Sequence, residues 1–277
     1  MRIIIAAIFI LSSVYVQSQK TIVYKQFDSF QLNMDIYYPP NMKKEKVYPS
    51  IIFYYGGGWS GDDRSHFAYY ASYYAKKGFV CIIPEYRTLS NHNATPFESL
   101  MDAKSVMRYV RKNASELKID ADRIIASGSS AGGRLATSLS TIRRYNDKND
   151  DLSVSCEPNA LILFNPIINY GSPSSGIDGT MNKYRDFSPL HNLHKDMPPT
   201  IYFQGTKDKI AKVETAEYYK KTIEKMNGFC ELKIFENAKH GFFNTSKFRK
   251  QCLTSIDAFL KEYGFFKGSR VALDIEG

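Results

Sequence analysis

The sequence has little that would point to a metal ion or to nucleic acid. Only four of its 277 residues are cysteines, and none stands at a spacing from histidine that would form a zinc site. Repeats, low-complexity tracts and inter-domain linkers are also missing. The net charge is +9, but acidic residues lie among the lysines and no nucleic-acid-binding motif accompanies them. We therefore expect no metal, no cofactor and no nucleic-acid partner.

Long apolar segments are absent except at the N-terminus. Residues 1–18 combine Arg2, an apolar run up to Leu11 and small residues near Ser18, which is the pattern of a secretory signal peptide. The run is too short to span a bilayer comfortably, so we expect cleavage after Ser18 and no stable membrane insertion. The mature protein is then secreted or periplasmic. Oxidation there would allow three full pairings of the cysteines, although Cys81 lies in a predicted buried strand.

Short apolar runs alternate with helical patterns through the rest of the chain. Helices are predicted over 96–112, which begins with a capping box, and over 213–226, which ends at Asn-Gly. The alternation predicts an α/β fold, with helices on both faces of a mainly parallel sheet, in one domain over residues 19–266. Residues 267–277 fit no packed element. Predicted strands lie in QLNMDIYY, SIIFYY, FVCII, RIIAS, ALILF, TIYFQ and CELKIF.

One predicted strand leads directly into a serine between glycines. The segment DADRIIASGSSAGG places Ser130 at the centre of a G-x-S-x-G pattern, after a strand and before a helix that starts near Ala131. A turn this tight requires small residues on both sides of the serine and exposes its hydroxyl. Ser130 is therefore the candidate nucleophile.

A serine nucleophile needs a base, and the base needs a carboxylate that orients it. His240 follows the last predicted strand, and Asp208 lies in the loop after the preceding strand. The order Ser130, Asp208, His240 is that of α/β-hydrolases. The other four histidines lie in less regular polar segments, and surface positions are expected for them.

Taken together, these segments resemble an α/β-hydrolase without a large cap domain. The chain is similar to secreted carbohydrate esterases of the bifunctional acetylxylan and feruloyl esterase type, and more distantly to hormone-sensitive-lipase-like carboxylesterases. The resemblance covers Gln31 to about Phe266 and rests on the motifs YYGGGW, PEYR, DADRIIASGSSAGG, QGTKD and KHGF.

The resemblance also assigns a role to the glycine cluster that follows the strand SIIFYY. It implies that the backbone N–H groups of Gly57, Gly58 and Ala131 form an oxyanion hole. This chain has Tyr55 where the family usually has histidine, which affects the support of the loop more than its backbone donors. Trp59, beside the loop, is a candidate substrate contact, and its alternative role is a wedge that holds the loop.

Two further motifs favour structural roles. Glu85 and Arg87, in PEYR, are expected to form a structural pair under the active site. The tyrosines of residues 69–78 could form a platform for sugars, but tyrosines at helical spacing more often pack a helix on a sheet.

The expected function is hydrolysis of O-acyl esters, acetyl or feruloyl, on polysaccharide through an acyl-enzyme. Only about a dozen residues separate the signal from the first predicted strand, and 165–199 offers little continuous helix, so an open site is expected. A general short-chain carboxylesterase or a lipase-like enzyme is the alternative. A noncatalytic hydrolase-fold binding protein is the alternative of another class, although such proteins usually lack a member of the triad.

Overall fold

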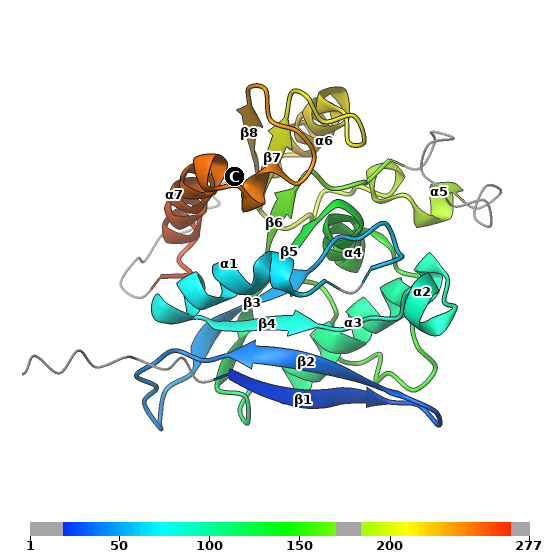
Figure 1. Ribbon diagram of the computed structural model, residues 1–277, viewed down its shortest axis with the longest axis vertical. Helices are drawn as coiled ribbons and strands as arrows, with labels where there is room; N and C mark the ends of the chain where they lie inside the picture. Colours follow the sequence, from blue (N-terminus) through cyan, green and yellow to red (C-terminus); the bar gives the residue numbers. More distant parts are fainter. Residues whose placement is uncertain (1–18, 62, 170–183, 267–277) are drawn as a thin grey trace, which may run out of the picture.

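The computed structural model describes residues 19–61, 63–169 and 184–266, and these form an eight-stranded sheet (Figure 1). The strand order is β1-β2-β4-β3-β5-β6-β7-β8. β1 pairs antiparallel with β2 and β2 with β4, and every other pairing is parallel. The strands are β1 (Gln19–Gln26), β2 (Gln31–Tyr37), β3 (Tyr48–Tyr54), β4 (Val80–Pro84), β5 (Ile119–Ser129), β6 (Ala160–Phe164), β7 (Thr200–Gly205) and β8 (Cys230–Phe235).

Helices cover both faces of this sheet. The chain runs from β3 through α1 to β4 in one direction and from β5 through α4 to β6 in the other, so right-handed crossovers place α1 and α4 on opposite faces. α7 lies beside α1 (Figure 1). The hydroxyl of Tyr73, in α1, donates to the carboxylate of Asp257, in α7, at 2.8 Å. The helices are α1 (Ser65–Lys76), α2 (Leu89–His92), α3 (Pro96–Lys112), α4 (Ser130–Thr141), α5 (Tyr184–Phe187), α6 (Val213–Lys225) and α7 (Ser246–Glu262), with 3-10 turns at Pro189–His191 and Phe242–Asn244.

This architecture confirms the predicted α/β-hydrolase fold. The central strands are buried along their whole length, which is why their sequences are continuous apolar runs. Between β6 and β7, the described residues hold only the four-residue α5 and one 3-10 turn, so no large cap domain lies in that part of the structure. The prediction omits β1, an edge strand in which Tyr24 is the one buried residue.

The predicted signal peptide, residues 1–18, and the tail, 267–277, lie outside the described residues. None of the described helices is both long enough and apolar enough to span a bilayer. All four cysteines are free thiols, and Cys81 is buried in the core strand where it was expected.

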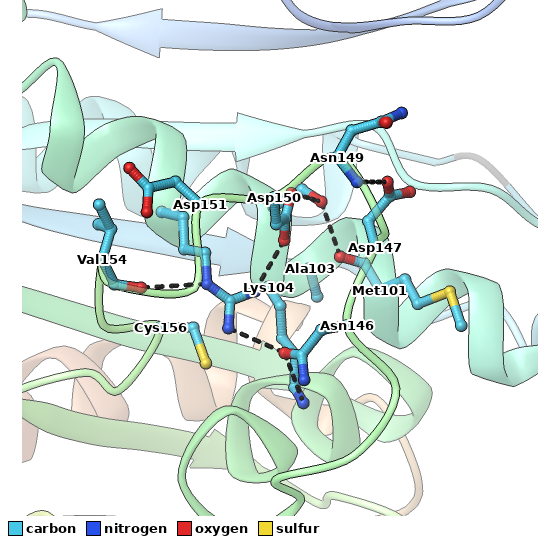
Figure 2. Close-up of polar contacts among 12 residues, drawn as sticks. Met101, Ala103, Lys104, Asn146, Asp147, Asn149, Asp150, Asp151, Val154 and Cys156 are labelled. Carbon is cyan, nitrogen blue, oxygen red and sulfur yellow. Dashed lines mark hydrogen bonds and ion pairs between the residues drawn. The ribbon is translucent and has the colours of Figure 1, made fainter.

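The helix that follows Ser130 is held at its far end by α3. The buried ammonium of Lys104 donates to the carbonyl oxygen of Ile142 at 2.6 Å and to that of Arg144. Burial lowers the pKa of Lys104 to about 8. Beside it, Arg108 donates to Asp150 at 2.7 Å, and Figure 2 shows Lys104 and Asp150 in this cluster between α3 and the loop after α4. A cation at the carboxyl end of α4 complements the helix dipole and fixes the helix.

Candidate active site

Ser130 lies at the turn between β5 and α4, as the sequence predicts. Its backbone φ is +53°, a conformation that residues other than glycine rarely adopt. The two glycines of the motif leave no room for a side chain. A Cβ on Gly128 would lie 2.3 Å from the carbonyl oxygen of Gly132, and a Cβ on Gly132 would lie 2.0 Å from that of Tyr54. The strained turn therefore depends on both glycines.

The structure brings the three predicted triad residues together. The Nε2 atom of His240 lies 2.9 Å from the Ser130 hydroxyl oxygen, and its Nδ1 atom lies 2.7 Å from Oδ2 of Asp208. The three residues follow β5, β7 and β8, so they meet at the carboxyl edge of the parallel strands. This geometry lets a proton pass from the hydroxyl to the imidazole while the carboxylate fixes the ring.

The environment of Asp208 keeps its carboxylate ionised. Burial alone would raise the pKa of this side chain, which has no exposed surface. The hydrogen bond with His240 and those from the backbone N–H groups of Ile210, at 2.8 Å, and Ala211, at 3.0 Å, outweigh burial and lower the pKa. The carboxylate can therefore stabilise an imidazolium without taking its proton.

The glycine loop lies beside Ser130. Gly57 and Gly58 have φ of +152° and +61°, and both line the same cleft as the serine. Among the described residues, no hydrogen bond uses the N–H of either glycine. Ala131 is buried in the first turn of α4. Gly56, the first glycine of the loop, packs so closely that a Cβ there would lie 3.1 Å from Cβ of Ser130.

Tyr55 supports the loop through an aromatic contact. Its ring is fully buried and stacks on Tyr86, with ring centroids 4.4 Å apart and planes 18° from parallel. The phenol thus occupies the position before the glycines as a packed side chain, and the loop keeps a rigid base where the family usually has histidine.

Trp59 lies between the cleft and the nucleophile helix. Its side chain is 8% exposed and lines the cleft beside Gly58. The guanidinium of Arg134, on α4, lies 5.6 Å from the centre of its ring. The contact joins the glycine loop to the nucleophile helix, as the wedge role requires, and contact of Trp59 with substrate stays a prediction.

The cleft around these residues has a volume of about 620 Å³. Its lining includes residues that sequence reasoning missed: His66, Asn165, Ile167, Asn169, Ile210, Phe243 and Asn244. Asn165 directly follows β6, has φ of +38°, and places Nδ2 within 3.4 Å of both ring nitrogens of His240. His66, on α1, lines the cleft and keeps 41% of its side chain exposed, which agrees with the surface position expected for it. Local sequence carries no signal for either residue, because tertiary folding places them there.

The PEYR segment departs from its predicted pairing, whereas the tyrosines of residues 69–78 include two that pack as expected. Glu85 and Arg87 do not form the predicted pair: Glu85 contacts Arg64 at 3.1 Å, and Arg87 contacts Asp102 at 2.7 Å. Each side chain pairs with an opposite charge from a distant part of the chain, Arg64 just before α1 and Asp102 in α3. In 69–78 the packing interpretation holds for Tyr70 and Tyr74, which are fully buried.

The described residues contain no cluster of three His, Cys, Asp or Glu side chains that could hold a metal ion. The chemistry available at this site is that of a hydroxyl, an imidazole, a carboxylate and backbone donors.

The chain is similar to known families and proteins. The model of the BD-FAE family matches residues 34–175, and that of the prolyl oligopeptidase family matches 163–265. Esterase LipC of Mycobacterium tuberculosis is 25% identical over 223 residues, which cover 71% of this chain and 54% of LipC. An acetylxylan esterase of Xylanibacter ruminicola is 27% identical over 229 residues, 76% of this chain and 45% of that protein. The chain thus spans about half the length of these curated relatives.

A solved structure matches over nearly the whole chain. Esterase 2 of Thermogutta terrifontis superposes with a TM-score of 0.84 at 34% identity, and the match covers 90% of this chain and 95% of that one. These relatives and structural neighbours are carboxylic ester hydrolases by name. The chain belongs to the BD-FAE family and is an α/β-hydrolase related to the carboxylesterases.

Proposed function

We propose that this protein is a serine carboxylesterase. The observation that carries the proposal is the continuous hydrogen-bonded relay from Ser130 through His240 to Asp208, at 2.9 and 2.7 Å. A noncatalytic hydrolase-fold protein has no use for this geometry, which disfavours the binding-protein alternative. The relationship to named esterases supports the same reaction class.

The reaction begins with attack by the Ser130 hydroxyl oxygen on the ester carbonyl carbon. His240 takes the hydroxyl proton at Nε2, and the ionised Asp208 stabilises the imidazolium that forms. The carbonyl oxygen becomes an oxyanion next to the N–H groups of Gly57, Gly58 and Ala131, which we assign as its donors. His240 then protonates the leaving alcohol, and an acyl group remains on Ser130.

Hydrolysis of the acyl-enzyme reverses these roles. His240, now neutral, takes a proton from a water molecule, which attacks the acyl carbon and forms a second oxyanion at the same donors. Collapse of this intermediate releases the acid, and the proton returns to Ser130. Both steps use the same triad side chains and the same backbone N–H donors.

We further propose that the substrate is an O-acyl ester, acetyl or feruloyl, on a polysaccharide. The polar side chains of His66, Asn169 and Asn244, which line the cleft, suit an alcohol that carries several hydroxyl groups. No large cap lies over the cleft in the described residues between β6 and β7, which suits a bulky substrate. One relative is an acetylxylan esterase by name. Secretion, predicted from residues 1–18, would bring the enzyme to such substrates.

A general short-chain carboxylesterase is a second candidate with its own support. Esterase 2 of Thermogutta terrifontis has been solved with propionate bound and with butyrate bound. That protein matches this chain over nearly its full length. Under this hypothesis the acyl chain of the substrate is short and the alcohol need not be a sugar.

A panel of esters separates these candidates. The mature protein is incubated with acetylated xylan, feruloylated arabinoxylan and p-nitrophenyl esters of two to sixteen carbons, and free acetate, ferulate and nitrophenol are quantified. Release from the glycans at rates comparable to those of the short esters supports the polysaccharide proposal. Hydrolysis of short esters alone supports the general carboxylesterase, and a preference for long chains supports a lipase-like enzyme. Ser130→Ala, run in parallel, identifies hydrolysis that this site does not catalyse.

A further inference from the structure

Tyr86, in the segment that follows β4, makes two contacts with the residue that precedes the glycine loop. Its ring stacks on that of Tyr55, and its hydroxyl donates to the Tyr55 carbonyl oxygen at 2.7 Å. Both side chains are nearly or fully buried. The hydrogen bond is therefore shielded from water, and breaking it would leave a buried carbonyl without this donor.

The Tyr55 carbonyl is also confined from the other side. A Cβ on Gly132, in α4, would lie 2.2 Å from this oxygen, so the peptide that joins Tyr55 to Gly56 packs directly on the backbone of the nucleophile helix. The tyrosine hydroxyl and the helix together fix the plane of this peptide. The direction of the chain through Gly57 and Gly58 depends on that plane, because glycines supply no side chains to hold the loop.

The segment that carries Tyr86 is itself anchored. Arg87 donates to the carboxylate of Asp102, on α3, from Nε at 2.7 Å and from Nη2 at 2.9 Å. On the other side of Tyr86, the carbonyl oxygen of Glu85 accepts from the hydroxyl of Tyr24 at 2.7 Å. Asp102 is fully buried. These contacts hold Tyr86 in place from α3 and from β1, so it can act as a fixed point for the loop.

We propose that Tyr86 is a positioning residue for the oxyanion hole: its hydroxyl orients the Tyr55–Gly56 peptide so that the loop donors point at the reacting carbonyl. The role rests on the proposed function. It predicts that the hydroxyl contributes to the transition state, where the oxyanion forms, and little to binding of the uncharged ester.

The test compares Tyr86→Phe with wild type and with Tyr54→Phe. Tyr54→Phe is a matched control, because Tyr54 is also fully buried and its hydroxyl also donates to a backbone carbonyl, that of Ala103 at 2.9 Å, away from the glycine loop. Loss of one oxyanion donor costs about 10²–10³ in turnover, and displacement costs less than removal, so Tyr86→Phe should lower kcat for p-nitrophenyl acetate about tenfold to a hundredfold. KM should change less than about twofold. Tyr54→Phe should lose about as much thermal stability as Tyr86→Phe and keep the wild-type kcat.

Reaction with paraoxon gives a second readout that counts only folded protein. Its phosphoryl oxygen uses the same donors, so the rate of modification of Ser130 should fall with kcat while the final modified fraction gives the folded share. A Tyr86→Phe variant with wild-type kcat and wild-type paraoxon rate would overturn the positioning role and leave the esterase proposal intact. A wild-type protein that neither hydrolyses any ester nor reacts with paraoxon would overturn the proposed function and the role with it.

Discussion

Replacement of Gly132 by alanine tests whether the contact between β3 and the nucleophile helix sets the active-site geometry. The added Cβ would lie 2.0 Å from the Tyr54 carbonyl oxygen and 2.2 Å from that of Tyr55, more than 1 Å short of ordinary contact. Both neighbours are backbone atoms at the end of a buried strand, so no flexible side chain can yield. The strand end and α4 must separate.

That separation should reduce both stability and rate. Overpacking of a core costs about 1–3 kcal/mol, and we expect Gly132→Ala at or above the upper end because backbone must move. Ser130 lies two residues before Gly132 on one side of the contact, and the glycine loop follows Tyr55 on the other. A shift of about 1 Å between a nucleophile and its oxyanion donors costs about a hundredfold in rate.

The assay measures the thermal midpoint and kcat for p-nitrophenyl acetate, with Gly78→Ala as a matched control. Gly78 has φ of +95°, but a Cβ there would meet nothing within 4 Å. Its replacement should cost about 1–2 kcal/mol through backbone strain and leave kcat unchanged. If Gly132→Ala kept the wild-type kcat, the close contact between helix and strand would not control the geometry of the site.

Three further outcomes are expected. Ser130→Ala should reduce hydrolysis of p-nitrophenyl acetate to background, a loss on the order of a million-fold, and a variant with a tenth of wild-type turnover would exclude Ser130 as nucleophile. Asp208→Asn should lose about ten-thousand-fold, because the amide favours the wrong tautomer of His240, and a loss below tenfold would contradict this role. The pKa of Lys104 is about 8 in the folded protein and ~10.4 in the unfolded chain. Between pH values of about 8 and ~10.4 the unfolded chain therefore binds more protons than the folded protein. The free energy of unfolding of wild type should therefore rise across that window by up to about 3 kcal/mol relative to Lys104→Met, and a pH-independent difference in denaturant titrations would refute the linkage.

The central sheet could be predicted because its strands are buried on both faces, which forces continuous apolar sequences. β6, Ala160–Phe164, and β8, Cys230–Phe235, begin and end where the sequence predicts. β1 could not be found in the same way. Its edge position leaves most side chains exposed, and its pairing with β2 comes from backbone hydrogen bonds that impose no pattern on the sequence.

The triad could be proposed from sequence because each member follows a recognisable strand in a fixed chain order. Partners between distant segments carry no such signal. The contact of Arg87 with Asp102 joins residues on two elements, and PEYR alone suggests a neighbouring partner instead. Asn165 is similar: it follows a predicted strand and precedes proline, yet its approach to His240 depends on how β6 and β8 end in space.

Tyr55 illustrates why a departure from a family motif is weak evidence against a function. The residue before the glycines has two separable tasks, to fix the loop and to leave the backbone donors free. A histidine and a stacked tyrosine can both do the first, and neither is involved in the second, which depends on Gly57 and Gly58. The substitution therefore requires a compensating partner elsewhere, and the ring and hydroxyl of Tyr86 supply one. Any homologue with Tyr at this position should then also carry, after its fourth strand, an aromatic side chain that can donate a hydrogen bond.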